Sequence, residues 1–280
     1  MPELSRADSR YMALRKNTIR NPNVAGTFYE KEPDLLRSRV TSFLNSAKGV
    51  PNLKQKHICA IIVPHAGYIY CGSVMASAYQ LLTGKKYDRI ILIGPSHFIE
   101  FQSVALDSAS AWKTPLGTIP LDQTMMKQFP KHTEFAVQPG VFDHEHSLEV
   151  QIPFIQAVLP SASLIPLCIG QDIPHTRIAE TISPLLTNTT LIVVSSDFSH
   201  YHPEEEANTI DKDSITAILS KNPDWIDTTV DACGLTGIKI LNDLAVIHHW
   251  KPHLLTYQTS GDVTREHEAV VGYASFAYAR

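Results

Sequence analysis

The chain has 280 residues, of which 44% are hydrophobic, and a formal net charge of −4. A chain of this length can bury a full core as one domain. Its slight acidity gives no electrostatic basis for binding nucleic acid or an anionic membrane. No apolar run approaches the roughly 18 residues that cross a bilayer, and the charged N-terminus contains no apolar signal segment. We therefore expect a cytoplasmic protein that makes no membrane contact.

The first part of the chain predicts alternating strands and helices. Residues 1–22 have mixed charge and no sustained period, so we expect an N-terminal arm followed by a single domain over residues 23–280. Apolar side chains at helical spacing follow Pro33, where a proline suits a helix start. A buried strand, a helix and a second strand are then predicted at residues 58–63, 72–82 and 87–94. This order is typical of a parallel sheet with helices on its faces.

The middle of the chain is less regular. Residues 102–112 and 117–119 suggest short antiparallel strands at one edge of the sheet, residues 121–129 a short helix, and residues 135–137 an extended segment. A helix is expected to begin near His146 with Ser147 as its N-cap. Pro153 should bend that helix or move its first turn later.

The last part of the chain returns to regular alternation. Strands are predicted at residues 163–169 and 190–195, helices at 177–186, 204–220 and 238–247, and two terminal strands, expected to pair, at 254–260 and 270–278. The fold class that follows is α/β, a single domain with a central, mainly parallel or mixed sheet flanked by helices.

Three predicted strands each deliver a histidine just past their carboxyl ends, namely His65, His97 and His200. In open α/β sheets this edge is where ligands bind. Loops at neighbouring strand ends can bring the imidazoles of His65 and His97 to one point. Two imidazole ligands suit zinc, copper, iron or nickel. For each histidine taken alone, a hydrogen-bonded loop residue is the alternative.

Four cysteines are scattered without CxxC spacing, and we expect free thiols rather than disulfides. Cys233 lies at or just before the start of a predicted helix, where the helix dipole favours the thiolate that binds metal or attacks an electrophile. A small buried side chain is the alternative for this residue. Cys59 and Cys168 lie inside predicted strands and are expected in the core, whereas Cys71 stays open.

Asp197 and His200 form a local pair after the strand at 190–195. Their spacing allows either a carboxylate that orients a metal ligand or a general acid/base beside a metal. The alternative is a capping aspartate with a surface histidine.

A dense group of titratable residues precedes the helix expected near residue 146: Asp143, His144, Glu145 and His146. The two histidines are too close in sequence for the HExxH pattern of metalloproteases. Helix capping is the alternative for this group, and Glu145 and His146 are its candidates for a pocket. P-loop, dinucleotide and serine-hydrolase motifs are absent from the sequence.

Several ordered motifs run along the chain: V-P-H-A-G-Y-x-Y-C-G-S, G-P-S-H, E-H-S-L-E-x-Q-x-P-F, S-S-D-F-S-H and D-x-C-G. With these motifs in this order, the chain from about Arg20 to its C-terminus resembles the Memo family. The bacterial and archaeal members of that family are called protein B of the AmmeMemoRadiSam system.

The resemblance implies a fold like that of class III extradiol dioxygenases, which hold non-haem iron(II). It also implies a metal site made of His65, His97 and Cys233, with Asp197, His200 and His146 lining the same pocket. Extradiol dioxygenases use two histidines and one carboxylate. A thiolate is a softer and oxidisable ligand. The thiolate therefore argues against ring cleavage, and it favours copper(I) or zinc more than a carboxylate would while still permitting iron. We expect one transition-metal ion, with iron(II) or copper ahead of zinc.

The function expected from these features is a metal-dependent oxidoreductase in which His200, Asp197 and His146 orient ligands or transfer protons. An extradiol-type dioxygenase acting on a catechol-like substrate is one alternative. A non-catalytic module that binds a peptide or small molecule in the same pocket is another. Aromatic residues expected near the rim would suit either kind of ligand: Phe28, Tyr29, Tyr68, Phe98 and Tyr201. The sequence leaves the metal, the substrate and the oligomeric state open.

Overall fold

The structure, a computed structural model, describes residues 18–48 and 51–280. Most of the predicted arm at residues 1–22 therefore lies outside the described residues. Its described end forms β1 (Ile19–Arg20), which pairs with β5 (Ala111–Thr114). Within the described ranges, no helix is long and apolar enough to cross a bilayer.

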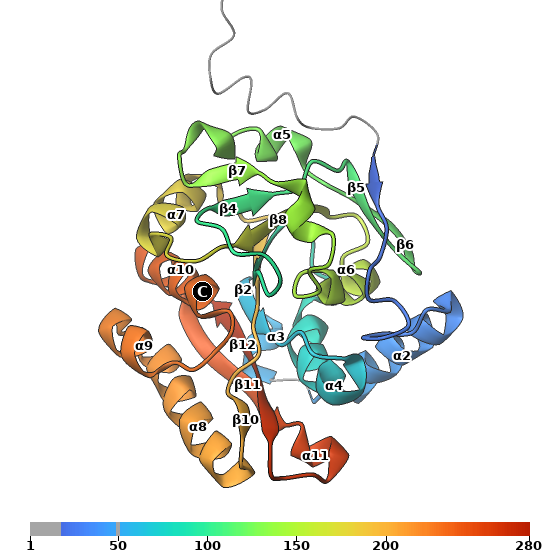
Figure 1. The fold of residues 1–280 in the computed structure, drawn as a ribbon, viewed down its shortest axis with the longest axis vertical. Helices are drawn as coiled ribbons and strands as arrows, with labels where there is room; N and C mark the ends of the chain where they lie inside the picture. Colours follow the sequence, from blue (N-terminus) through green and yellow to red (C-terminus); the bar gives the residue numbers. More distant parts are fainter. Residues whose placement is uncertain (1–17, 49–50) are drawn as a thin grey trace, which may run out of the picture.

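A nine-stranded mixed sheet forms the centre of the molecule, in the order β10-β12-β2-β9-β3-β8-β4-β7, with β11 paired to β12 (Figure 1). The four central strands β2, β9, β3 and β8 are parallel, and the flanking pairs β2–β12 and β8–β4 are antiparallel. The strands are β2 (Ile58–Val63), β3 (Arg89–Pro95), β4 (Val104–Leu106), β7 (Phe135–Val137), β8 (Ser163–Ile169), β9 (Thr190–Ser195), β10 (His200–His202), β11 (Lys251–Thr259) and β12 (Val270–Ala279). The predicted α/β class is confirmed.

The central strands are apolar on both faces because helices cover both sides of the sheet. Every residue of β2 and β9 is buried, as expected for parallel strands between two helical layers. Helices α2, α4 and α6 lie on one side, and α7 and α10 on the other (Figure 1). The helices are α2 (Pro33–Ser46), α3 (Pro51–Lys54), α4 (Tyr68–Tyr79), α5 (Gln123–Met126), α6 (Ile152–Val158), α7 (His175–Ile182), α8 (Glu204–Ser220), α9 (Pro223–Thr229), α10 (Leu235–Ile247) and α11 (Gly261–Thr264).

Most predicted strands are confirmed, including the pairing of the two terminal ones, β11 and β12. The strands that lie between β3 and β7 in the sequence are divided between two sheets, which was not expected. Strand β4 joins the main sheet, but β5 and β6 (Gly117–Pro120) form a hairpin in a separate three-stranded sheet with β1. Helix α4 begins at Tyr68, earlier than predicted, because the chain enters the helix directly after Gly67.

The prediction that a helix starts near His146 is wrong. A short 3-10 turn (Glu149–Gln151) precedes α6, which begins at Ile152 and holds Pro153 in its first turn. A proline is harmless there because its missing N–H would have no helical partner. Ser147 caps no helix, because its hydroxyl instead donates to the Pro95 carbonyl oxygen at 2.8 Å. His146 therefore lies in a loop just before this turn, where its carbonyl oxygen accepts from the Val150 N–H at 3.1 Å.

The loop after β9 is held by a buried carboxylate on α8. Asp211 accepts hydrogen bonds from the Ser199 N–H at 3.0 Å and the Tyr257 hydroxyl at 2.8 Å. Gly272 on β12 pairs with the same loop, donating to Ser199 and accepting from Phe198. A Cβ at position 272 would lie only 1.8 Å from Asp211 Oδ2. Glycine is therefore required where β12 passes this carboxylate.

Replacing Gly272 with alanine should destabilise the fold by about 1–3 kcal/mol, the usual cost of overpacking. The added methyl group must displace the Asp211 carboxylate, which is buried and holds the loop. Urea unfolding measures the change. Gly140→Ala is the control, since a Cβ there meets its nearest atom only at 4.0 Å. Equal midpoints for the two variants would contradict this account.

Candidate metal centre

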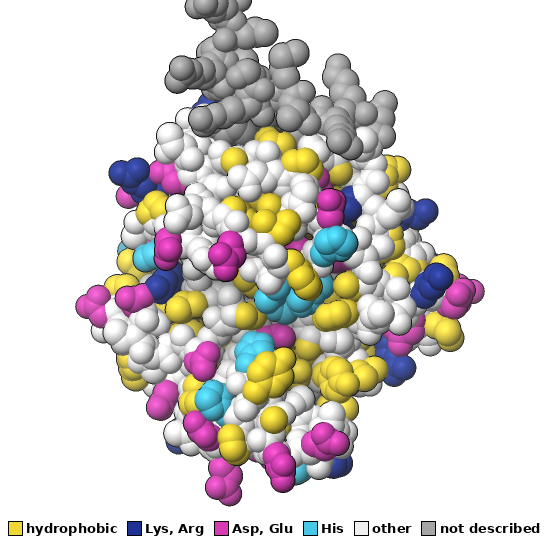
Figure 2. All heavy atoms as spheres, viewed as in Figure 1, with side chains coloured by type: hydrophobic (Ala, Val, Ile, Leu, Met, Phe, Trp, Pro, Cys, Tyr) yellow, Lys and Arg dark blue, Asp and Glu magenta, His cyan; other side chains and the backbone are white. Residues whose placement is uncertain are grey.

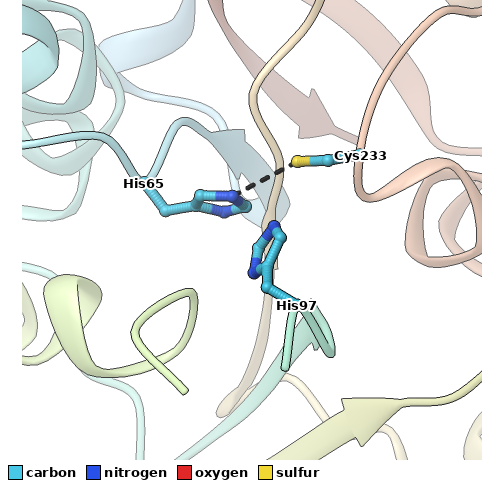
Figure 3. Close-up of side chains that lie close together, drawn as sticks. All are labelled: His65, His97 and Cys233. Atoms are coloured by element: carbon cyan, nitrogen blue, oxygen red, sulfur yellow. Dashed lines mark hydrogen bonds between the residues drawn. The ribbon is translucent and has the colours of Figure 1, made fainter. Parts of the chain in front are cut away.

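Three side chains from distant parts of the chain meet at the carboxyl edge of the sheet. His65 follows β2, His97 follows β3, and Cys233 precedes α10 (Figure 3). One ligand atom from each lies within 4.8 Å of the others, and His65 Nε2 is 3.2 Å from Cys233 Sγ. The sheet explains this convergence, because β2 and β3 both neighbour β9 and all three run in the same direction.

The ring of His97 is oriented by Glu145. Its Nδ1 lies 2.9 Å from Glu145 Oε1, and its backbone N–H donates to Oε2 at 2.6 Å. An ionised carboxylate only accepts, so Nδ1 carries a hydrogen and Nε2 is left for a ligand. Burial acts to raise the pKa of Glu145, but the hydrogen bonds and charge of His97 and the backbone N–H of Ser147 outweigh it and lower this pKa to about 2. Glu145 is therefore a carboxylate at neutral pH.

His65 is the most enclosed of the three. Its Nδ1 lies 3.0 Å from Ser195 Oγ, and its backbone N–H donates to Asp197 Oδ1 at 2.7 Å. Burial, reinforced by the charge of His97, lowers the pKa of His65 to about 3. The imidazole is therefore neutral at physiological pH, which is the form that binds metals.

Cys233 is held by the backbone around Asp197. The Asp197 N–H donates to Sγ at 3.3 Å, and the Cys233 N–H donates to the Asp197 carbonyl oxygen at 3.2 Å. Burial and the nearby Asp197 carboxylate raise the pKa of the Cys233 thiol. Burial therefore opposes the thiolate that the dipole of α10 was expected to favour. A bound cation would have to displace the thiol proton.

Asp197 and His146, both predicted to line the pocket, lie beside the three ligand candidates. Asp197 is buried, and burial raises its pKa. The His146 ring stacks on His97 with centroids 4.7 Å apart and lies 5.5 Å from the His65 ring. His146 Nδ1 is buried and has no hydrogen-bond partner among the described residues. His200 begins β10 and is half-buried, and its charge acts on His65 and Asp197.

Other sequence candidates lie away from the site or serve the core. Asp143 and His144 are exposed and lie outside the cluster of His65, His97 and Cys233. Tyr29 and Tyr68 were expected near the rim and are instead buried, because their hydroxyls donate to Glu149 and to a backbone carbonyl. Phe28 does reach the site, with its ring 4.7 Å from that of His146.

A buried ion pair that was not predicted from the sequence anchors this region. Arg20 Nη1 contacts Glu149 Oε2 at 2.8 Å, and the same guanidinium donates to the carbonyl oxygens of Phe142 and Glu145. Glu149 also accepts from the backbone N–H groups of Asn23 and Val24. The described start of the chain is thus tied to the loop that presents Glu145. The acidic residue within E-H-S-L-E was the available signal.

The site opens to solvent next to a cavity of about 390 Å³. Histidine side chains are visible in a central depression, with apolar side chains around them (Figure 2). The cavity lies between the ends of β3 and β8 and the first turn of α10, and its walls include Pro95, Ser96, Ile169, Gly170, Cys233 and Thr236. A ligand in this cavity would therefore contact the Cys233 side of the site.

The residues present fit a transition-metal ion. Two imidazoles, each with its Nδ1 already in a hydrogen bond, and one sulfur form a soft donor set. Such a set is suited to copper, zinc or iron. Histidines that bind a metal usually donate the N–H of their second ring nitrogen to a fixed acceptor. Here Ser195 offers such an acceptor to His65, and Glu145 offers one to His97.

Comparisons with known proteins agree with the sequence motifs. A family model described as Memo-like protein matches residues 20–277. A MEMO1 family protein of Caldivirga maquilingensis is 33% identical over 282 residues, covering 92% of this chain and 98% of the relative. Another, from Sulfurisphaera tokodaii, is 35% identical over 283 residues, covering 93% and 99%.

A solved structure shows the same fold at much lower sequence similarity. The uncharacterized protein JW3007 from Escherichia coli K12 superposes with a TM-score of 0.53 and 12% identity, over 79% of this chain and 99% of that one. At this identity the likeness concerns the fold alone. The family model and the two archaeal relatives, by contrast, cover nearly the whole described chain, and the protein belongs to the Memo family.

Proposed function

We propose that the protein binds one transition-metal ion through His65, His97 and Cys233 and uses it in oxidation–reduction chemistry. The observation that carries this proposal is the convergence of the three donor atoms within 4.8 Å. Both histidines are also held at Nδ1, by Ser195 and Glu145 respectively. Iron(II) or copper is proposed ahead of zinc, because oxidation–reduction chemistry needs an ion that changes its oxidation state, which zinc does not. Such an ion would supply an electron and an open coordination position.

The surrounding side chains would then handle protons and exclude water. Asp197 contacts the backbone of His65 and the sulfur of Cys233, and His200 is near enough to act electrostatically on His65 and Asp197. A carboxyl and an imidazole would therefore be available to give or take a proton at a bound ligand. The ring of His146 stacks on the ring of His97. Phe28 packs against His146 and limits access of water from that direction.

Metal analysis after anaerobic purification tests the proposal. The wild-type protein should carry about one iron or copper ion per chain, and His65→Ala should lose it. Anaerobic handling matters because oxidation of Cys233 would discard the ion. His144→Ala is the matched control, since this exposed histidine lies near the loop of His146 but outside the cluster. Equal metal content in the two variants would contradict the proposal.

Replacing Glu145 with glutamine should weaken metal binding by about 10–100-fold, the usual cost of losing a carboxylate that orients a ligand histidine. Glutamine keeps the size of the side chain but removes the charge that holds the His97 Nδ1 hydrogen. A competition titration with a chelator measures the affinity. Glu134→Gln is the control, since this residue directly precedes β7, pairs with Arg177 and is not part of the cluster. Unchanged affinity in Glu145→Gln would show that His97 needs no such support.

Ligand binding without turnover is a second candidate function. Phe98 and Tyr201 near the opening are 61% and 77% exposed, and exposed aromatic residues often mark a binding surface. Oxygen consumption by the metal-loaded protein with catechols separates the candidates. Ring cleavage would favour an extradiol-type dioxygenase, and oxidation without cleavage an oxidoreductase. Stoichiometric metal with no turnover would favour a module that binds a peptide or small molecule.

A further inference from the structure

The hydroxyl of Ser195, the last residue of β9, is surrounded by three polar atoms. Ser195 Oγ lies 2.6 Å from the Ser147 carbonyl oxygen, 2.8 Å from Gln151 Nε2 and 3.0 Å from His65 Nδ1. Ser195 and Gln151 are both fully buried. Water therefore does not compete for these contacts, and the hydrogens must be shared among the four groups themselves.

Only one placement of these hydrogens satisfies every group. A hydroxyl has one hydrogen and two lone pairs. The Ser147 carbonyl oxygen only accepts, so it takes the single Ser195 hydrogen. The Gln151 amide nitrogen only donates, so it occupies one lone pair of Ser195 Oγ. The second lone pair faces His65 Nδ1, which must therefore carry a hydrogen.

The orientation of the Gln151 amide is fixed independently. Its Nε2 also donates to the Pro64 carbonyl oxygen at 2.8 Å, and its Oε1 accepts from the Tyr79 hydroxyl at 3.0 Å. Turning the amide over would place its oxygen against the Pro64 carbonyl oxygen and leave two buried acceptors without donors, at a cost of about 1–3 kcal/mol each. Tyr79 is itself fully buried. The amide therefore points its hydrogens at Ser195.

We propose that Ser195 and Gln151 are positioning residues that hold His65 in the tautomer with a hydrogen on Nδ1 and a lone pair on Nε2. That lone pair points at Cys233, toward the position where the metal would bind, so this inference rests on the proposed function. His97 reaches the same tautomer by a different route, through Glu145. The two ligand histidines are thus set by separate hydrogen-bond networks, and each can be disturbed without the other.

The tautomer can be read directly in the metal-free protein by ¹⁵N–¹H NMR of labelled histidines, with His65→Asn to assign the signal. Wild-type His65 is expected to show Nδ1–H. In Ser195→Ala the imidazole loses its acceptor and should shift toward Nε2–H, while His97 stays as Nδ1–H. Wild-type His65 with its hydrogen on Nε2 would overturn the inference without any variant. So would a Ser195→Ala spectrum identical to that of the wild type.

Binding of Co²⁺ provides the second readout. Ser195→Ala should lower Co²⁺ affinity by about 10–100-fold, because the Nε2 hydrogen must be removed before the metal binds. The control is Ser275→Ala, a fully buried serine on β12 whose hydroxyl has no partner among the described residues. Ser195→Ala that binds Co²⁺ as tightly as Ser275→Ala would overturn the positioning role. A wild-type protein with the expected tautomer but no Co²⁺ binding would instead contradict the proposed function.

Discussion

Replacing Cys233 with serine should reduce metal affinity by more than the roughly 100-fold lost with a supporting residue, because a direct ligand disappears. A serine hydroxyl does not ionise near neutral pH, so these three positions would offer two neutral imidazoles and no anionic donor. Chelator competition with Co²⁺ measures the change, and the loss of the sulfur-to-metal charge-transfer band identifies its cause.

A matched control exists for this variant on the same sheet. Cys59 lies near the start of β2, at the opposite end of the strand from His65, and is buried. Cys59→Ala should bind metal as the wild type does. A Cys233→Ser protein with wild-type affinity and an unchanged spectrum would exclude the thiolate as a ligand and leave a site with two histidines.

Replacing Glu149 with glutamine should lower the free energy of unfolding by about 3–5 kcal/mol, the cost of breaking a buried ion pair from one side. The side chains of Arg20 and Glu149 are only 9% and 1% exposed. Without the carboxylate, the guanidinium would remain buried with carbonyl oxygens as its acceptors and no opposing charge. The described start of the chain would then lose its main anchor. Urea unfolding measures this change.

The control for this variant is an ion pair on the surface. Arg177 is 68% exposed and contacts Glu134 at 3.2 Å, so Arg177→Gln should cost about 0–1 kcal/mol. Similar losses in the two variants would mean that burial adds nothing to the Arg20–Glu149 pair. A loss of metal affinity in Glu149→Gln without a loss of stability would also contradict the anchoring role.

The regular part of the fold could be predicted because its strands are buried on both faces. Strands β2, β8 and β9 have the predicted bounds, since continuous apolar runs end sharply at proline, glycine or serine. The parallel order of β2, β9 and β3 also placed His65 and His97 at one edge of the sheet. The helix near His146 was wrong because hydrogen bonds to Glu145 and Pro95 hold residues 146 and 147 in a loop. Such tertiary contacts leave no periodic signal.

The residues behind the ligands were the hardest to predict. Ser195 reads as the end of a strand, and Gln151 as one polar residue in an apolar segment. Their role depends on contacts with His65 and Tyr79 across long sequence separations. The ligand candidates, by contrast, are residue types with strong chemistry at positions that the sheet topology specifies. The sequence therefore identified what could bind a metal, with Glu145 as a pocket candidate beside it, but missed Ser195 and Gln151 next to His65.

X-ray absorption spectroscopy of the Zn²⁺-loaded protein reports the atoms bound to the ion and so decides whether His65, His97 and Cys233 hold it. We expect one sulfur at about 2.3 Å and imidazole nitrogens at about 2.0–2.1 Å. The sulfur signal should vanish in Cys233→Ser, and the imidazole signal should weaken in His97→Ala. A wild-type spectrum with only oxygen ligands, or one without sulfur, would contradict this ligand set.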